Sequence, residues 1–281
     1  MTGALGCEVL DVNLAVRWFL ASKSLDVETI QKALHDWNVV FFRDQHDLDR
    51  DSHLALAKLL GTPDRHPIVT GVEGHPDIMR VVREAGAPTN FGETWHSDNS
   101  YMKTPSMGSI LRGIEIPEYG NDTLFANMYL AYESLSDGLK ATLDSLKGVH
   151  GAGRAFSTTD PTRADRYSGK AGDLKYQESE VLDEVVEHPV VRTHPVTGRK
   201  ALYVNEMFTY RFSGWTDEES APLLQYLFTH MAQPQFQCRF RWAPGSVAFW
   251  DNRCTTHLAL GDMASTRRVI ERITLEGEVP Q

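Results

Sequence analysis

The stretch Thr94-Trp95-His96-Ser97-Asp98 is the part of this 281-residue chain around which we expect the fold to be organised. If it is a β-strand, residues two apart share one face, so His96 and Asp98 point the same way. A distant histidine would then complete a set of two histidines and one carboxylate. That arrangement is the facial triad of non-haem Fe(II) oxygenases, which leaves other metal positions open to small molecules. His-x-Asp alone is a weak signal, so the interpretation depends on the rest of the chain.

The composition, with 41% hydrophobic and 23% charged residues, is typical of a soluble globular protein. The formal net charge of −10 argues against a nucleic acid or an acidic membrane surface as partner, but not against a small anionic substrate. No apolar run is long enough to span a membrane, and Met1–Gly6 lacks the regions of a signal peptide. Cys7, Cys238 and Cys254 have no metal-like spacing, which favours reduced thiols in a cytoplasmic protein.

Hydrophobic periodicity and turn residues predict many short strands with helices inserted between them. The predicted helices cover about 27–37, 50–60, 127–146 and 217–230. The predicted strands cover about 39–42, 78–82, 107–114, 123–126, 190–193, 201–204, 236–242, 246–250 and 267–275. Residues 151–187 are polar and show no sustained period, which is typical of a lid or loop insertion. The chain is therefore predicted to be one mainly β domain, 1–281, with inserted helices and a barrel or jelly-roll core.

The end of the chain contains a candidate for the third histidine and a candidate anion site. His257 follows an apolar strand and a polar turn, unlike the other histidines. Eleven residues later, Arg268 and Arg272 lie on one face of a predicted strand, roughly 13 Å apart. They are either surface arginines paired with nearby carboxylates or buried guanidinium groups that require anions, because an unpaired buried charge is very costly.

Six motifs follow one another along the chain: Trp95-His96-Ser97-Asp98, Gly120-Asn121-Asp122-Thr123-Leu124-Phe125, His188-Pro189-Val190-Val191-Arg192-Thr193-His194-Pro195, Val204-Asn205-Glu206, Trp250-Asp251-Asn252-Arg253 with His257, and Arg267-Arg268 with Arg272. In this order they resemble the taurine dioxygenase (TauD/TfdA) family of Fe(II)- and 2-oxoglutarate-dependent oxygenases. The resemblance covers roughly residues 5–280 and implies a double-stranded β-helix, or jelly-roll, fold.

The resemblance implies an iron site and a co-substrate site. His96, Asp98 and His257 would bind Fe(II), and the ion would be chelated by 2-oxoglutarate and would take up O2. Arg268 and the hydroxyl of Thr123 would bind the far carboxylate of 2-oxoglutarate. The implied reaction hydroxylates a C–H bond of a small organic anion and yields succinate and CO2.

The resemblance also implies a substrate pocket. Arg272 would hold the anionic group with help from His66, and Phe156 and Phe208 would form aromatic walls. The taurine-type motif has a tyrosine where this chain has Val69. This loss of a phenol favours a bulkier, more apolar anion. The substrate classes left open are sulfonates such as taurine, alkyl sulfates and aryloxyalkanoates.

Two further departures from the family pattern concern loops. Gly92 stands where the taurine-type pocket has an asparagine, and Asn90 is an alternative for that role. Asn121 replaces the second glycine of the family's Gly-Gly-Asp-Thr, and we expect the turn to survive because asparagine tolerates a positive φ.

Two other functions remain open, and the resemblance adds an assembly state. The first is a non-catalytic jelly-roll protein that binds 2-oxoglutarate. The second is a hydrolase or isomerase that uses the triad with Zn(II) or another metal, in which Arg268 and Thr123 have no evident role. Relatives form dimers or tetramers, so a homo-oligomer is expected by analogy.

Overall fold

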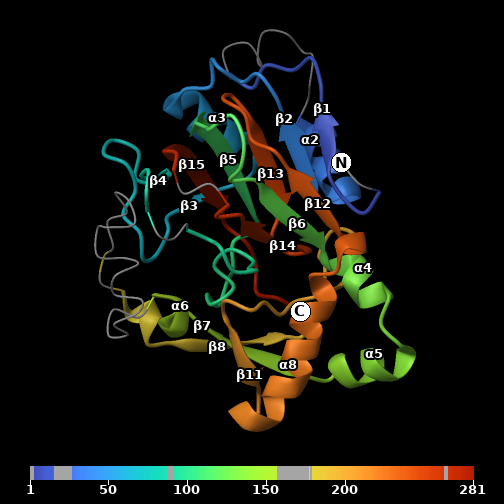
Figure 1. Cartoon of the computed structure of the whole chain (residues 1–281). Helices are drawn as coiled ribbons and strands as arrows, with labels where there is room; N and C mark the ends of the chain where they lie inside the picture. The colour runs from blue at the N-terminus through green and yellow to red at the C-terminus, as the bar shows by residue number, and fades with distance from the viewer. Residues whose placement is uncertain (1–2, 16–26, 88–90, 157–176, 178, 263–264) are drawn as a thin grey trace.

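The computed structural model describes residues 3–15, 27–87, 91–156, 177, 179–262 and 265–281. Most strands gather in one part of the molecule, and helices α5 and α8 lie with strands β7, β8 and β11 in the other (Figure 1). No described helix has the length and apolar character needed to cross a membrane. The strand-rich part carries the candidate site.

The larger sheet is formed by seven strands in the order β1-β2-β13-β5-β15-β3, and β4 also pairs with β15. Their bounds are β1 Cys7–Val9, β2 Val39–Phe42, β3 Pro63–Asp64, β4 Met79–Arg83, β5 Gly108–Glu115, β13 Val247–Asp251 and β15 Arg268–Leu275. Apart from the parallel β1–β2 pair, neighbours in this sheet are antiparallel. Strand β15 is central, because it pairs with β5 on one side and with β3 and β4 on the other.

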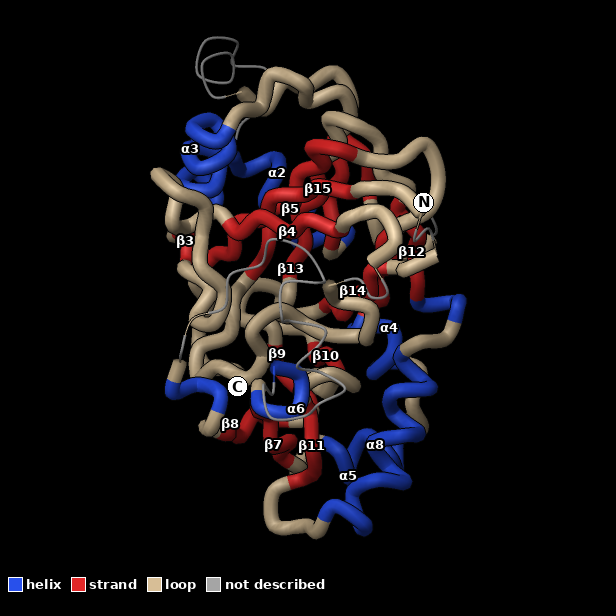
Figure 2. The backbone as a smooth tube through the Cα atoms, turned by 60° about the vertical axis from the view of Figure 1, so that its left-hand side comes forward, coloured by secondary structure: helices blue, strands red, loops and turns tan. Residues whose placement is uncertain are grey.

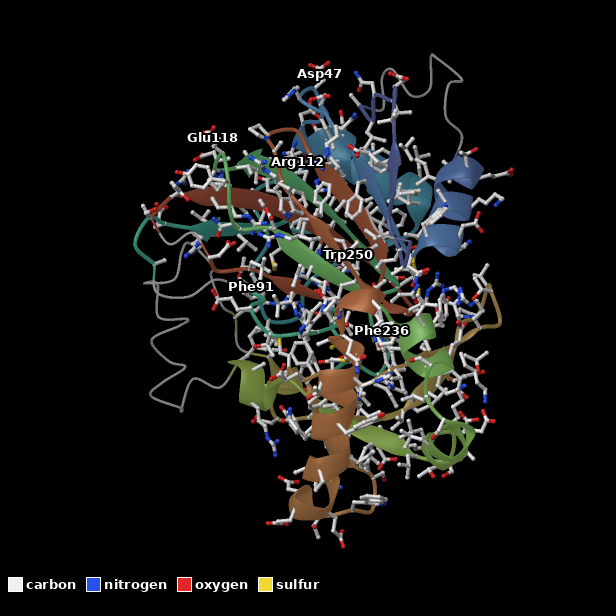
Figure 3. The ribbon with its side chains drawn as sticks, turned by 45° about the vertical axis from the view of Figure 1, so that its right-hand side comes forward. Asp47, Phe91, Arg112, Glu118, Phe236 and Trp250 are labelled. Atoms are coloured by element: carbon white, nitrogen blue, oxygen red, sulfur yellow. The ribbon has the colours of Figure 1, made fainter. Side chains whose placement is uncertain are left out.

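The smaller sheet has the order β12-β6-β14 and faces the larger one. Its strands are β6 Thr123–Asn127, β12 Gln237–Phe240 and β14 Thr255–Ala259. Rings from the two sheets meet between them: Phe41 stacks on Phe240 at 4.1 Å, and Phe125 lies 5.5 Å from Trp250. Trp250 is 1% exposed and lies in the interior (Figure 3). Two antiparallel sheets packed around such a core form a jelly roll, which confirms the predicted fold class.

The outer face of the larger sheet is covered by α2 (Val27–Trp37) and α3 (Arg50–Leu60). Both helices have the predicted bounds. Helix α3 begins after Asp49, whose side chain accepts a hydrogen bond from Ser52 N, and ends at Gly61. Glu271, on the outer face of β15, pairs with Arg50 at 2.7 Å. The predicted alternation along β15 is therefore correct, since Glu271 points away from the face that carries Arg268 and Arg272.

The other part of the molecule packs helices against two small sheets around a second core. Figure 2 shows α4, α5 and α8 together, away from α2 and α3. The remaining elements are α4 Met128–Glu133, α5 Asp137–Leu143, β7 Lys147–Gly151, α6 Gly153–Phe156, η1 Glu180–Leu182, β8 Val185–Pro189, β9 Val191–Thr193, β10 Lys200–Leu202, β11 Thr209–Phe212, α8 Asp217–Met231 and η2 Pro234–Phe236.

The structure differs from two local predictions and describes only part of a third predicted segment. The helix predicted over 127–146 is two helices, α4 and α5, because Ser136 adopts an extended conformation and caps α5. The stretch 94–98 is not a strand: His96 forms one isolated bridge with His257, and a turn follows. Of the predicted lid at 151–187, the structure describes α6, η1 and β8 at the two ends, whereas 157–176 and 178 lie outside the described residues.

Candidate active site

Three buried side chains, His96, Asp98 and His257, come together where the loop before β5 meets β14. The backbones of His96 and His257 exchange two hydrogen bonds of 3.0 and 2.8 Å. Asp98 Oδ1 lies 3.7 Å from His96 Nε2 and 3.9 Å from His257 Nε2. One ligand atom from each residue falls within 4.8 Å of the others. The two histidines and the carboxylate predicted from the sequence thus converge, although through a bridge and a turn instead of a strand.

The two imidazoles are oriented for coordination. His96 Nδ1 donates a 2.7 Å hydrogen bond to the carbonyl of Thr94, which leaves the lone pair of Nε2 directed at Asp98. The His257 ring packs against Trp250, with ring centroids 4.7 Å apart. Burial lowers the pKa of both histidines below the usual value, so both are neutral near pH 7. Neutral imidazole is the form that binds a metal ion.

Asp98 is held by Ser109, which the sequence did not single out, and by Asn252 and Arg272 from two of the motifs. Ser109 Oγ donates to Oδ2 at 2.6 Å, and Asn252 Nδ2 donates to Ser109 Oγ at 3.2 Å. Asn252 Oδ1 also accepts from the backbone N–H of Asp98. The other oxygen, Oδ1, accepts from Arg272 Nη1 at 2.5 Å. Burial opposes ionisation, but the positive charge of Arg272 holds the pKa of Asp98 well below its ordinary value.

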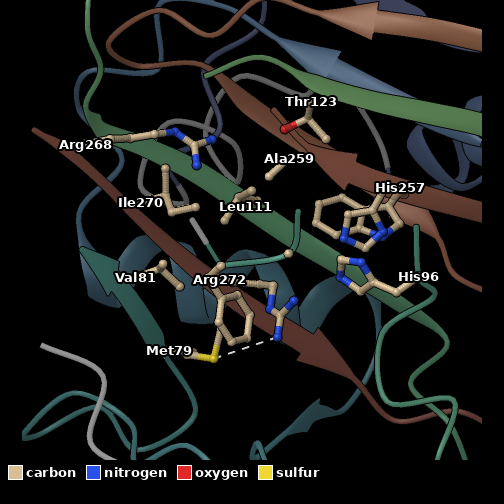
Figure 4. A pocket seen from close by; sticks show the side chains of 13 residues that line it. Met79, Val81, His96, Leu111, Thr123, His257, Ala259, Arg268, Ile270 and Arg272 are labelled. Carbon is tan, nitrogen blue, oxygen red and sulfur yellow. Dashed lines mark hydrogen bonds between the residues drawn. The ribbon is translucent and has the colours of Figure 1, made fainter. Parts of the chain in front are cut away.

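A first pocket, here called the inner pocket, runs from His257 along the interior face of β15 (Figure 4). Its empty volume, counted together with its mouth, is about 430 Å³. Arg268 and Arg272 reach into it from β15, and Thr123 from β6. Trp242 Nε1 donates to Thr123 Oγ1 at 2.9 Å, so the hydroxyl hydrogen of Thr123 remains available to an acceptor. The rest of the lining is Met79, Val81, Phe91, Gly92, His96, Leu111, Trp250, Ala259 and Ile270.

A second pocket, here called the aromatic pocket, lies on the other side of the triad and has an empty volume of about 340 Å³. Phe156 and Phe208 line it, and their ring centroids lie 6.2 Å apart. Its remaining lining is His66, Phe91, Gly92, His96, Asp98, Asn99, Tyr101, Met207 and Arg272. Phe91, Gly92, His96 and Arg272 line both pockets, so the triad and one arginine stand at their boundary.

Two backbone hydrogen bonds fix the tautomer of His66. Its Nδ1 accepts from the backbone N–H groups of Ile68 and Val69, which places the hydrogen on Nε2. Burial, and then the charge of Arg272, lowers the pKa of His66 to about 3, so it is a neutral donor. Val69 itself packs in the core and lines a small cavity beside His66 and Arg272, not the aromatic pocket. Asn90, the alternative to Gly92, lies outside the described residues.

These residues fit the groups that the sequence implies. Two neutral imidazoles and one carboxylate oxygen are a donor set suited to Fe(II). In the inner pocket, Arg268 is 2% exposed, and its Nε and Nη2 have no hydrogen-bond partner within the described part of the chain. A buried guanidinium group with two nitrogens unpartnered among the described residues, in the same pocket as a hydroxyl that can donate, is suited to a carboxylate.

Comparison with known proteins finds, over nearly the whole chain, the same family that the sequence motifs resemble. The family model described as "Taurine catabolism dioxygenase TauD, TfdA family" matches residues 3–274. The chain belongs to the TauD/TfdA family. Family members are enzymes, and this chain is a 2-oxoglutarate-dependent dioxygenase that uses Fe(II) and O2 and acts on a small organic substrate.

Individual TauD/TfdA relatives align over all or nearly all of this chain and over most of their own length. A Pseudomonas putida alpha-ketoglutarate-dependent sulfate ester dioxygenase is 34% identical, over 100% of this chain and 89% of that protein. An alkylsulfatase from Acinetobacter baylyi is 35% identical, over 99% of this chain and 84% of that protein. The crystal structure of a taurine dioxygenase from Burkholderia xenovorans has a TM-score of 0.79 at 38% identity, covering 100% of this chain and 89% of that one. These relatives bear the names of enzymes and give no support to the non-catalytic alternative, and membership of the TauD/TfdA family favours Fe(II) over the Zn(II) alternative.

Proposed function

We propose that this enzyme hydroxylates an alkyl sulfate ester at the carbon beside the ester oxygen. The product of that step, a hydroxyalkyl sulfate, separates into an aldehyde, sulfate and a proton, while 2-oxoglutarate and O2 become succinate and CO2. The observation that carries the proposal is the boundary position of Arg272, a buried cation next to the triad that also faces an aromatic pocket. The two relatives named for sulfate esters add support.

In the proposed site, His96, Asp98 and His257 would hold Fe(II), with Nε2 of both imidazoles and Oδ1 of the carboxylate nearest one another. Fe(II) held there would supply the O2-dependent oxidation of an unactivated C–H bond. Ser109 keeps Oδ2 of Asp98 turned away, which presents Oδ1 to the ion. Arg268 and the Thr123 hydroxyl receive the far carboxylate of 2-oxoglutarate in the inner pocket. These roles agree with the donor geometry and the burial of each side chain.

In the same proposal, Arg272 binds the sulfate group and His66 donates its Nε2 hydrogen to it. Phe156 and Phe208 exclude water and contact the alkyl chain, as apolar pockets generally do. Gly92 leaves room in the aromatic pocket because it has no side chain. Val69, which the sequence placed among the substrate-binding residues, does not line this pocket and has no contact role in the proposal. A small amino-sulfonate would leave the aromatic walls without contact, so taurine ranks below an alkyl sulfate.

The experiment is a comparison of succinate release with hexyl sulfate, taurine and phenoxyacetate under air and without oxygen. We expect hexyl sulfate to give succinate and sulfate in equal amounts, only with Fe(II) and O2. The Arg272→Ala variant should lose at least about tenfold in kcat/KM for hexyl sulfate but bind 2-oxoglutarate nearly as the parent does. Turnover of taurine alone would refute the sulfate assignment, and activity without oxygen would favour the Zn(II) alternative.

An aryloxyalkanoate is the second candidate, because Phe91 and Tyr101 add two further aromatic rings to the pocket walls. A carboxylate beside an aryl ether would engage Arg272 in the same way, and the ring would stack on those walls. Preference for phenoxyacetate over hexyl sulfate in the same panel would favour it.

Assembly, location and the lid complete the proposal. We infer one domain over 1–281, a lid within 151–187, a homodimer or homotetramer, and a place in the cytoplasm. Light scattering after size-exclusion chromatography tests the assembly, and protection of 151–187 from protease by substrate tests the lid.

A further inference from the structure

A second buried arginine, Arg83, stands directly opposite Arg268. Strands β4 and β15 pair antiparallel with Arg83 facing Arg268, Val81 facing Ile270 and Met79 facing Arg272. Because side chains alternate along a strand, Arg83 shares the face of β4 that carries Val81 and Met79. Both of those residues line the inner pocket. The side chain of Arg83, 3% exposed, therefore lies on the pocket side of β4 and beside Arg268, although it does not itself line the pocket.

The pair of arginines places two positive charges side by side at this end of the sheet. Asp122 is the acidic residue whose charge favours the Arg268 cation, but its Oδ2 already accepts from Arg239 Nε at 2.6 Å. Burial, and then the charge of Arg83, lowers the pKa of Arg268 to about 10. Like charges directly opposite each other in a sheet repel, and burial strengthens the repulsion. An anion beside Arg268 would relieve it.

Arg83 is also tied to the turn that presents Thr123. Its Nη1 donates to Asn121 Oδ1 at 2.5 Å, and Asn121 is fully buried. Asn121 has a φ of +56°, and its backbone N–H donates to Asp262 Oδ1 at 2.7 Å. The TauD/TfdA motif that this turn resembles has a glycine at that position, which can adopt the φ angle but cannot accept from an arginine. The side chain of Asn121 thus fixes Arg83 relative to both Thr123 and Arg268.

We propose that Arg83, held by Asn121, is a second cationic positioning residue for the co-substrate and sets the preference for a 2-oxo acid with a distal carboxylate. Arg83 acts through its charge and through the Thr123 turn, while Arg268 makes the contact. The inference rests on the proposed placement of 2-oxoglutarate at Arg268 and Thr123. It predicts that the loss of Arg83 weakens 2-oxoglutarate binding much more than binding of 2-oxopentanoate, which lacks the distal carboxylate.

The test is calorimetric binding of both 2-oxo acids to the Mn(II)-loaded protein, with steady-state kinetics alongside. For Arg83→Gln we expect about a tenfold rise in the Kd of 2-oxoglutarate and little change for 2-oxopentanoate. The KM for 2-oxoglutarate should rise more than kcat falls. Asn121→Gly, which keeps the backbone conformation and both arginines, should shift the same ratio by a smaller factor.

Arg267→Gln is the matched control, because Arg267 precedes Arg268 but is exposed and paired with Glu84 and Glu115. It should leave both affinities unchanged. An equal loss of both 2-oxo acids in Arg83→Gln and Asn121→Gly would overturn the inference, since it would indicate a purely structural role. Arg268→Gln distinguishes failure of the proposed function from failure of the inference on Arg83. If it does not weaken 2-oxoglutarate, the proposed function itself fails; if it does and Arg83→Gln has no effect, only this inference fails.

Discussion

Replacement of Ser109 by alanine tests how the site presents Asp98. The Ser109 hydroxyl is fully buried and donates to Asp98 Oδ2 at 2.6 Å, while Asn252 donates to Ser109 in turn. A hydrogen bond to a charged group contributes about 1.5–3 kcal/mol. In Ser109→Ala that contribution is lost, and the carboxylate can rotate away from the two histidines. We therefore expect metal affinity to fall about 10- to 100-fold, which corresponds to about 1.4–2.8 kcal/mol.

The assay is an anaerobic titration of metal-free protein with Fe(II) or Mn(II), followed by calorimetry. Ser220→Ala is a suitable control, because Ser220 is equally buried and its hydroxyl donates to the carbonyl of Thr216, on the helix α8 that lies away from the triad. It should cost stability without altering metal affinity. A folded Ser109→Ala variant that binds metal as tightly as the parent would refute the argument that Ser109 orients Asp98.

Three further predictions use other parts of the molecule. In Gly92→Ala, whose φ is +83°, the new Cβ would lie 3.1 Å from His96 Cε1, so metal affinity should fall; Gly74→Ala, with a φ of +78° and open space, should lose only about 1–2 kcal/mol of stability in urea unfolding. Burial lowers the pKa of His53 to about 3, against about 6.5 in the unfolded chain. Between these pH values the unfolded chain binds one more proton than the folded protein, so the free energy of unfolding falls as the pH falls through that window. The loss of unfolding free energy between pH 7 and 4.5 should therefore be about 2–3 kcal/mol smaller in His53→Gln, as measured by urea unfolding at both pH values. Phe156→Leu should shift kcat/KM toward longer alkyl sulfates, by up to about fourfold per added methylene, and an unchanged chain-length profile would place the alkyl chain elsewhere.

The sequence predicted best where local pattern and burial agree. Helix α3 has a capping Asp49 at its start and Gly61 at its end, and its bounds were predicted correctly. The alternation along β15 also placed Arg268 and Arg272 on one face, because successive side chains of a strand point to opposite sides, and the structure shows that this face is the interior one. In both elements the local signal is sufficient, since no distant contact has to be known.

The sequence predicted less where distant segments decide the geometry. His96 and Asp98 were expected on a strand, whereas the pairing of His96 with His257, 161 residues away, holds one bridge and lets the chain turn at Asp98. Ser109 carries no local signal at all, because its role follows from the register of β5 against β13 and the position of Asn252. Arg83 was overlooked for the same reason, as only the pairing of β4 with β15 brings it to Arg268.

The two pockets that meet at the triad differ in what builds them. The inner pocket is lined mostly by strands of the two sheets, whereas His66, Tyr101 and Phe208 reach the aromatic pocket from loops and Phe156 from the short helix α6. Loops accept substitutions, insertions and deletions more readily than paired strands do. Mutations that reshape the aromatic pocket can therefore accumulate without disturbing the oxidising half of the site. For directed evolution, libraries confined to these loop positions would select for activity on new anionic substrates while the iron and 2-oxoglutarate sites stay unchanged.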